Sequence, residues 1–417
     1  MVSCYGNIQL LKDRGLSMTR YNFDKITNRK GTNCLKYDFA VERGKPADVL
    51  PLWVADMDFT VSEEITKSLH AAVEHGIYGY TQPKDAYYNA VMNWMERNHN
   101  WKTEREWIVK TPGVVFALGA AVKAFTDPGD AILIQNPVYY PFTNIIRDND
   151  RRVVDNTLIY EKTAGQSGDN GYRIDFEDFE RKLEQEHIKL FILCNPHNPV
   201  GRVWTVEELQ QLGEICLRHH VIVVSDEIHN DFVYPGYEHT VFATVDPRFA
   251  EFTVTCTAPS KTFNLAGLQI SNIFIPNEKL RKAFQTEIDK TGYDEPNALG
   301  IVACEAAYRA GEDWLDQLRA YLLKNLNFLR NFLQEKIPQI HLVEPEGTYL
   351  VWLDCSELGI TGKELDQFIV DKAGLWLDGG SMFGPSGAAF QRVNIACPQA
   401  TLELALNKLK AAVDNLK

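Results

Sequence analysis

Short apolar runs alternate with segments of helical periodicity along the middle of the chain. The clearest runs are Ala131–Ile134, Leu190–Cys194, 221–225 and 252–256. Runs of this length that are rich in aliphatic and β-branched residues are typical of buried strands. Their alternation with helical segments predicts parallel strands that are joined by helical crossovers.

One of the connecting helices carries a clear start signal. Thr205 and Glu208 have the spacing of a capping box, in which each side chain binds the backbone N–H of the other residue. An apolar stripe at helical spacing follows, formed by Val206, Leu209, Leu212, Ile215 and Cys216. The pattern therefore predicts an amphipathic helix between the second and third of the apolar runs.

The pattern changes after about residue 300 of the sequence. A long helical stretch over 303–336 precedes a strand-like run at 349–353. Further helical segments follow near 362–372 and 402–416. The C-terminal part therefore differs from the alternating strands and helices before it, which indicates a separate structural unit.

The length supports a division into domains, because a single core stops growing near roughly 250–300 residues and this chain has 417. We predict an α/β fold whose large domain, 65–300, has a mostly parallel sheet with helices on both faces. Residues 18–64, as an N-terminal arm, and 301–417 are expected to form a smaller α+β domain from both chain ends. Residues 1–17 precede Met18, lack a continuous apolar run and are expected to be an extension rather than a secretory signal.

Charge and cysteine content narrow the functional class. The chain has 43 Lys and Arg against 56 Asp and Glu, for a net charge of −13. This balance argues against nucleic acid or an anionic membrane as a partner, and no run approaches the roughly 20 apolar residues of a membrane span. The eight cysteines lack the paired spacing of a metal site and are expected to be reduced thiols of a cytoplasmic protein.

Polar residues follow three of the predicted strands. Asn195 opens the proline-rich segment 195–201, Asp226 ends the next strand, and Lys261 stands just after a third. In open α/β sheets the carboxyl ends of the strands face the ligand, so an amide, a carboxylate and an amine are expected to converge there. Each signal alone is weak, since such residues are commonly turn formers, helix caps or surface charges.

The order Asn195, Asp226, Lys261 and Arg392 resembles the fold type I pyridoxal-phosphate enzymes, in their class I/II aminotransferase-like branch. Finer similarity points to the cystathionine β-lyase and cysteine-S-conjugate β-lyase subgroup. It is carried by the segments Trp53-Val54-Ala55-Asp56-Met57-Asp58-Phe59, Asn195-Pro196-His197-Asn198-Pro199, Asp226-Glu227-Ile228-His229-Asn230-Asp231 and Ser260-Lys261-Thr262-Phe263-Asn264-Leu265-Ala266-Gly267-Leu268. The resemblance extends from about Tyr21 to the C-terminus.

The resemblance implies a role for each of the polar residues around a pyridoxal 5'-phosphate cofactor. Lys261 would hold the cofactor as a Schiff base, and Asp226 would face the pyridine nitrogen and keep it protonated. Asn195 would donate its amide to the phenolic oxygen of the ring. His229 lies where relatives often place a tyrosine for the same oxygen, although a structural histidine is the alternative.

The cofactor phosphate is expected at the start of a helix. Gly113, Val114 and Val115 open the apolar helical segment Val114–Phe125, whose first turn has no acidic residue, and free amides at such an end bind anions. The alternative is an ordinary glycine turn before a core helix. Ser260 would add a hydroxyl, while Gln269 stands where many aminotransferases carry an arginine.

Aromatic residues and an arginine would complete the implied site. Tyr139 would stack on the ring face, with Tyr140 as the alternative, and Tyr80 matches a tyrosine that relatives supply across a homodimer interface. Either tyrosine could instead be a core residue. Arg392 is the candidate clamp for the α-carboxylate of an amino-acid substrate, with a surface ion pair as the alternative.

The resemblance favours C–S β-elimination on L-cystathionine or a related S-substituted cysteine, which releases a thiol, pyruvate and ammonia. A thiol with a pKa near roughly 8.5 is a good leaving group. An aminotransferase that passes the amino group to a 2-oxo acid is the alternative, because Lys261 serves both reactions. A non-catalytic regulatory module is disfavoured, since the residues before Trp53 show no DNA-binding pattern.

Overall fold

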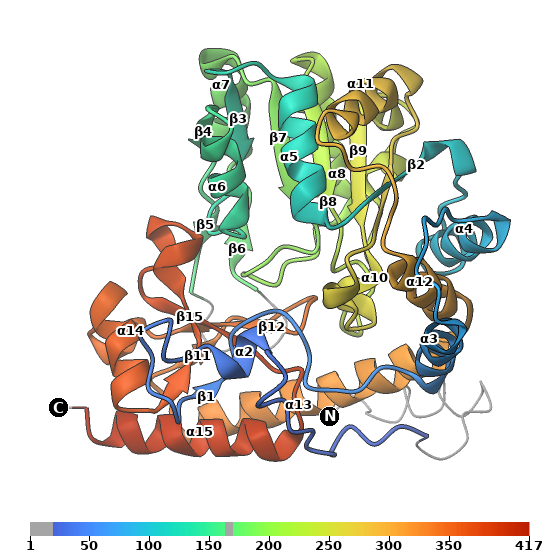
Figure 1. Ribbon diagram of the computed structural model, residues 1–417. Helices are drawn as coiled ribbons and strands as arrows, with labels where there is room; N and C mark the ends of the chain where they lie inside the picture. The colour runs from blue at the N-terminus through green and yellow to red at the C-terminus, as the bar shows by residue number, and fades with distance from the viewer. Residues whose placement is uncertain (1–19, 163–169, 417) are drawn as a thin grey trace.

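A seven-stranded sheet forms the centre of the larger part of the molecule (Figure 1). The computed structural model describes residues 20–162 and 170–416, so the expected extension 1–17 and Met18 lie outside the described residues. In order across the sheet, the strands are β2 (Ile108–Thr111), β10 (Ser271–Phe274), β9 (Thr253–Thr257), β8 (Ile222–Asp226), β7 (Leu190–Cys194), β3 (Ala131–Ile134) and β4 (Arg152–Asp155). Strand β10 runs antiparallel to both neighbours and the other pairs are parallel, which confirms the predicted mostly parallel sheet.

Helices cover both faces of this sheet, as predicted. Successive side chains of a strand point to opposite faces, and in β7 Leu190 and Ile192 belong to one apolar core while Phe191 and Leu193 belong to another. The helices that contribute to the first core are α5 (Val114–Phe125), α6 (Pro141–Asp148) and α11 (Glu278–Asp289), and those of the second are α7 (Phe176–Glu186) and α8 (Val206–Arg218). Burial on both faces explains why these strands read as continuous apolar runs.

The local signals in the sequence correspond closely to the elements. Helix α8 begins with the predicted capping box, in which Glu208 N donates to Thr205 Oγ1 at 3.2 Å and Thr205 N donates to Glu208 Oε2 at 2.9 Å. The predicted strands 221–225 and 252–256 each begin one residue later than expected. At β8 the reason is that Val221 N donates to Cys216 O and so belongs to the end of α8.

The helical stretch expected at 303–336 is two helices, α12 (Ala298–Ala310) and α13 (Glu312–Lys336). Gly311 separates them, and its N–H donates to Ala307 O at 2.8 Å. A Cβ at Gly311 would lie 2.3 Å from Phe263 Cε1, so only glycine fits this close approach. The break lets α12 pack on the helices α3 (Glu63–His75) and α4 (Asp85–His99).

A second, antiparallel sheet lies in the smaller part of the molecule, with α13, α14 (Gly362–Asp371) and α15 (Gln399–Asp414). Its strands, in order, are β11 (His341–Leu342), β12 (Leu350–Asp354), β15 (Phe390–Asn394) and β14 (Asp378–Gly379). The pairing of β1 (Leu50–Pro51) with β13 (Leu375–Trp376) joins the two chain ends. The remaining elements are α2 (Leu35–Asp38), α9 (Phe242–Val245), α10 (Pro259–Thr262) and the hairpin of β5 (Ile159–Tyr160) and β6 (Tyr172–Arg173).

The domain limits stay a prediction, and the limit expected near residue 300 falls inside α12. Among the helices within the described ranges 20–162 and 170–416, none is long and apolar enough to cross a membrane.

Candidate active site

A cavity of about 180 Å³ lies at the edge of the large sheet where the parallel strands end. Cys194, Asp226 and Cys256 are partners in the register of β7, β8 and β9, so the polar residues that follow these strands start from one edge. The predicted site residues that line the cavity are Gly113, Val114, Val115, Tyr139, Asp226, His229, Ser260 and Lys261. The structure thus brings together most of the residues that the sequence singled out.

Lys261 enters the cavity from the short helix α10, directly after β9. Its Nζ donates a hydrogen bond to the backbone oxygen of Ala55 at 2.9 Å. Burial is the main cause that lowers the pKa of Lys261 to about 8. The guanidinium of Arg392 also lowers this pKa, whereas the carboxylates of Asp56 and Asp226 raise it. A larger share of this amine is therefore neutral near pH 7 than for an exposed lysine, as a nucleophile or a base requires.

Asp226 ends strand β8 and is 4% exposed. Burial raises the pKa of Asp226 to about 7, whereas the backbone N–H of Ile228 and the charge of Lys261 favour the carboxylate. The Ile228 N–H donates to Asp226 Oδ1 at 3.2 Å. A buried carboxylate with one backbone donor is suited to binding a cationic ring nitrogen, whose charge would offset the cost of burial.

Another part of the cavity lining, at the start of α5, is suited to an anion. Helix α5 begins at Val114, with Gly113 as its N-cap and no acidic residue in its first turn. The first N–H groups of a helix have no partner within the helix and carry a positive potential. Ser260 lines the same cavity, so amides and a hydroxyl are placed where a phosphate would bind.

Two aromatic residues, Tyr139 and His229, also line the cavity. Tyr139 faces it, whereas Tyr140 packs against the ring of Phe383, with ring centroids 6.1 Å apart. His229 is 3% exposed, and its Nδ1 has no hydrogen-bond partner among the described residues. Burial and the positive charges of Lys261 and Arg392 hold the pKa of His229 well below its usual range, so the ring is neutral and its Nδ1 is open to a ligand.

Comparison with known proteins agrees with this geometry. The model of the aminotransferase class I and II family matches residues 47–409. The chain belongs to this family.

Several relatives in this family align with nearly the full length of the chain. Cystathionine beta-lyase PatB from Bacillus subtilis is 46% identical over 392 residues, which cover 94% of this chain and 100% of that protein. The crystal structure of cystalysin from Treponema denticola, which contains a pyridoxal 5'-phosphate cofactor, has a TM-score of 0.91 and 38% identity and covers 96% of this chain and 100% of that one. The PLP-bound C–S lyase from Staphylococcus hominis has a TM-score of 0.87 and 35% identity, with 95% and 98% covered.

One asparagine of the aminotransferase-like site differs from the prediction. Asn195 does not line the cavity, because its side chain is engaged elsewhere: its Nδ2 donates to Thr240 O at 3.3 Å, and its Oδ1 accepts from Trp204 N at 3.3 Å. Asn198, the second asparagine of the same segment, lines the cavity instead. Of the two asparagines in this segment, Asn198 is therefore the one that a ligand in the cavity could contact.

Arg392 lies on β15 beside the cavity and is 3% exposed, so it is no surface ion pair. Its Nη1 donates to Asn198 Oδ1 at 2.9 Å, its Nε donates to Asp378 Oδ2 at 3.1 Å, and its Nη2 also binds Asp378. Asp378 faces Arg392 across the pairing of β14 and β15 and is 4% exposed. These buried partners fix the guanidinium next to the cavity, as a clamp for a carboxylate requires.

Sequence reasoning missed Asp378, Ala55 and Tyr349. Tyr349 is fully buried, and its hydroxyl donates to the Ala55 oxygen at 2.9 Å, the same oxygen that accepts from Lys261. Asp378 precedes two glycines and is indistinguishable in sequence from a turn residue. Ala55 acts through its backbone oxygen, for which a side-chain pattern has no signal.

Tyr80 does not line the cavity. It is 96% exposed, in the segment without regular structure between α3 and α4. The predicted role for Tyr80 therefore needs a second subunit.

Proposed function

We propose that this protein is a pyridoxal-phosphate-dependent C–S β-lyase that cleaves L-cystathionine or a related S-substituted cysteine. The observation that carries the proposal is the 46% identity to the Bacillus subtilis cystathionine beta-lyase over 94% of this chain. The cavity supports it, because Lys261 and Asp226 line it and Arg392 donates a hydrogen bond to Asn198, which lines it as well.

The residues of the cavity fit the cofactor. Pyridoxal phosphate supplies an electron-poor ring that accepts the electrons of the Cα–H bond of an amino acid. Asp226 would hold the ring nitrogen, while His229 and Asn198 would face the phenolic oxygen, and the start of α5 would hold the phosphate. The unpartnered Nδ1 of His229 and the uncompensated burial of Asp226 are both relieved by such a ligand.

Lys261 performs the proton transfers in this proposal. With a substrate bound, the neutral amine of Lys261 would accept the Cα proton, and its lowered pKa favours that neutral form. Arg392 would hold the α-carboxylate and so fix which bond of Cα faces Lys261. The Cα electrons would then form the Cα=Cβ double bond as the Cβ–S bond breaks with its electron pair on sulfur, and a proton from Lys261 would complete the thiol. Hydrolysis of the remaining 2-aminoacrylate by water would give pyruvate and ammonia.

Lyase activity is tested by incubating the cofactor-loaded protein with L-cystathionine in the absence of any 2-oxo acid. We expect pyruvate, ammonia and a thiol in equal amounts, because all three arise from one elimination. Pyruvate is measured with a coupled reduction and the thiol with a chromogenic disulfide. Amino transfer to an added 2-oxo acid without release of pyruvate would instead identify an aminotransferase and exclude the proposal.

We also propose that the enzyme is a cytoplasmic homodimer in which Tyr80 reaches the site of the neighbouring subunit. Support comes from the exposed apolar side chains around this tyrosine, with Val73, Ile77 and Tyr78 each at least half exposed (50%, 72% and 61%). An isolated subunit gains nothing from such a surface, whereas a dimer buries it. The cysteines in the described part of the chain are free thiols, as expected in a reducing cytoplasm.

Complementation between two defective subunits tests the action of Tyr80 in trans. Tyr80→Ala and Lys261→Ala are each expected to be weakly active alone. After co-refolding in equal amounts we expect about a quarter of wild-type activity, because about half of the dimers are mixed and each mixed dimer has one intact site out of two. Activity is read as pyruvate release, and dimer mass by light scattering. A mixture that stays as inactive as its components would place Tyr80 in its own subunit's site or outside any site.

A further inference from the structure

The segment Trp53–Phe59 presents one backbone oxygen to the reactive amine. The carbonyl oxygen of Ala55 accepts hydrogen bonds from Lys261 Nζ and from the Tyr349 hydroxyl, each at 2.9 Å. Asn394 Nδ2 donates to the backbone oxygens on either side, Val54 at 2.7 Å and Asp56 at 2.6 Å. The position of the Ala55 carbonyl is therefore fixed by its flanking residues.

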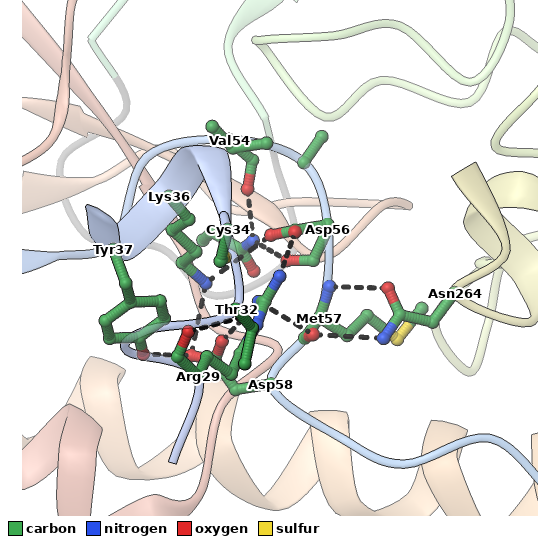
Figure 2. A network of polar contacts seen from close by, with 12 residues as sticks. Arg29, Thr32, Cys34, Lys36, Tyr37, Val54, Asp56, Met57, Asp58 and Asn264 are labelled. Carbon is green, nitrogen blue, oxygen red and sulfur yellow. Dashed lines mark hydrogen bonds and ion pairs between the residues drawn. The ribbon is translucent and has the colours of Figure 1, made fainter. Parts of the chain in front are cut away.

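The loop that follows Lys261 is hydrogen-bonded to the same segment. Asn264 Oδ1 accepts from Met57 N at 2.9 Å, and Asn264 Nδ2 donates to the backbone oxygens of Met57 and Phe59, each at 3.0 Å. Figure 2 shows the two contacts between Asn264 and Met57 beside the charged residues. Segment 53–59 and the Lys261 loop are thus one connected unit, so a change in either alters the geometry between Ala55 and Lys261.

A network of charged residues holds the segment from the other side (Figure 2). Asp58 is bound by Arg29 Nη1 at 2.7 Å, by Lys36 Nζ at 3.1 Å and by the Tyr37 hydroxyl at 2.9 Å. Asp56 Oδ2 accepts from Arg29 Nη2 at 2.5 Å. Its other oxygen, Oδ1, is buried without a hydrogen-bond partner among the described residues, with Lys36 Nζ 3.9 Å away.

The carboxylates of Asp56 and Asp58 therefore differ in how many donors surround their charge. Asp58 has three donors within 3.1 Å, whereas Asp56, the residue next to Ala55, has one hydrogen-bond donor, and its Oδ1, without a hydrogen-bond partner among the described residues, lies 3.9 Å from Lys36 Nζ. Of the charges that act on Lys261, Asp56 has the largest effect in raising its pKa, Asp226 adds to it and Arg392 opposes it, while His229 is neutral. The negative charge of Asp56 favours the protonated form of the Lys261 nitrogen.

We propose that Asp56 is a positioning residue for Lys261: it fixes the Ala55 carbonyl on the amine and supplies a negative charge whose strength Arg29 sets. Lys261 then keeps its ammonium form long enough to return a proton after taking one from Cα. The inference rests on the proposed lyase function for its role in catalysis, but its electrostatic content requires only that Lys261 bind the cofactor.

The test removes the negative charge of Asp56 in one variant and the positive charge of Arg29 in another. The absorbance band of the Lys261-bound cofactor changes with pH as the linking nitrogen loses its proton, and its midpoint is measured without turnover. We expect Asp56→Asn to lower the midpoint by about one pH unit, because a negative charge is removed. Arg29→Gln is expected to raise it, because the Asp56 charge is no longer neutralised, and Arg29→Lys is expected to restore the wild-type value.

Controls separate this effect from general damage to the network. Tyr37→Phe removes one hydrogen bond to Asp58, and Asp58→Asn removes an equal charge that is bound by three donors. Both are expected to lower the melting temperature with little change in midpoint. Shifts of the same sign in Asp56→Asn and Arg29→Gln, or no shift in either, would overturn the inference while leaving the lyase proposal standing. A wild-type protein that forms no such band would refute the cofactor assignment and with it both proposals.

Discussion

Lys261→Ala is expected to lower kcat/KM for pyruvate release from L-cystathionine by at least about 10³-fold, since it removes both a covalent attachment point and the proton carrier. The cavity geometry requires a large effect, because the Lys261 amine is placed at one point by the Ala55 oxygen and its pKa is lowered to about 8. Activity is measured by pyruvate release. Covalent attachment is measured by borohydride reduction followed by denaturation and desalting, after which the cofactor should stay on the wild type alone.

The exposed Lys282 provides a matched control for this variant. Its side chain is 76% exposed on α11, so Lys282→Ala is expected to leave activity and attachment unchanged. A small primary amine in the buffer is expected to restore part of the activity of Lys261→Ala, because the space left by the side chain can admit a soluble base. Wild-type turnover in Lys261→Ala, or retention of the cofactor on the denatured variant, would show that another residue has the function.

The strand-end residues show how far sequence reasoning reached. Asp226 and Lys261 were predictable because each follows an apolar run, and the carboxyl ends of parallel strands meet at one edge of a sheet. Helix Val114–Phe125 begins where the glycine and the apolar periodicity indicated. In these cases a local pattern and a general rule of topology place the residues at one edge of the sheet, whereas their roles came from the family resemblance.

The choice between Asn195 and Asn198 shows where that reasoning fails. Both asparagines precede a proline in the same short segment, so local propensity does not distinguish them. The distinction comes from contacts remote in sequence: Thr240 and Trp204 bind Asn195, whereas Arg392 binds Asn198. Tertiary contacts therefore decide which of the two asparagines, three positions apart in the sequence, lines the cavity.

The residues that support Arg392 and Lys261 could not be predicted from the sequence for a second reason. Asp378 acts because β14 pairs with β15, and β14 has only two residues, too few for a periodic pattern. The sequence resemblance included Asp56, but its relation to Lys261 passes through the backbone of Ala55. Residues that act through a backbone atom or a neighbour are found only after the fold has placed them.

Asp226→Asn is expected to lower kcat/KM by about 10²- to 10⁴-fold, because a neutral amide does not hold the ring nitrogen in its protonated form. The substitution preserves the shape of the side chain and an acceptor for the Ile228 N–H. The exposed Asp85, whose side chain is 82% exposed, provides a control with the same change of charge. Pyruvate release by Asp226→Asn at the wild-type rate would exclude the proposed role.

The same variant is also expected to change the melting temperature, by an amount that depends on pH and with a sign that depends on the cofactor. Burial raises the pKa of Asp226 to about 7 in the folded chain, above the value of about 3.9 expected in the unfolded chain. The folded state therefore holds a proton that the unfolded state loses, so this group reduces stability as the pH rises through that interval and reduces it fully above pH 7. Without cofactor, Asp226→Asn should melt above the wild type at both pH values, by a smaller margin at pH 5 than at pH 8.

With cofactor bound, the order at pH 8 is expected to reverse, because the ring nitrogen provides the positive charge that the buried carboxylate lacks. Differential scanning fluorimetry of both proteins, with and without pyridoxal phosphate at pH 5 and pH 8, measures all of these differences. If the cofactor raised both melting temperatures equally at pH 8, Asp226 would not face the ring nitrogen. The reversal connects stability to chemistry, since the charge that destabilises the empty site is the one that holds the cofactor in its reactive form.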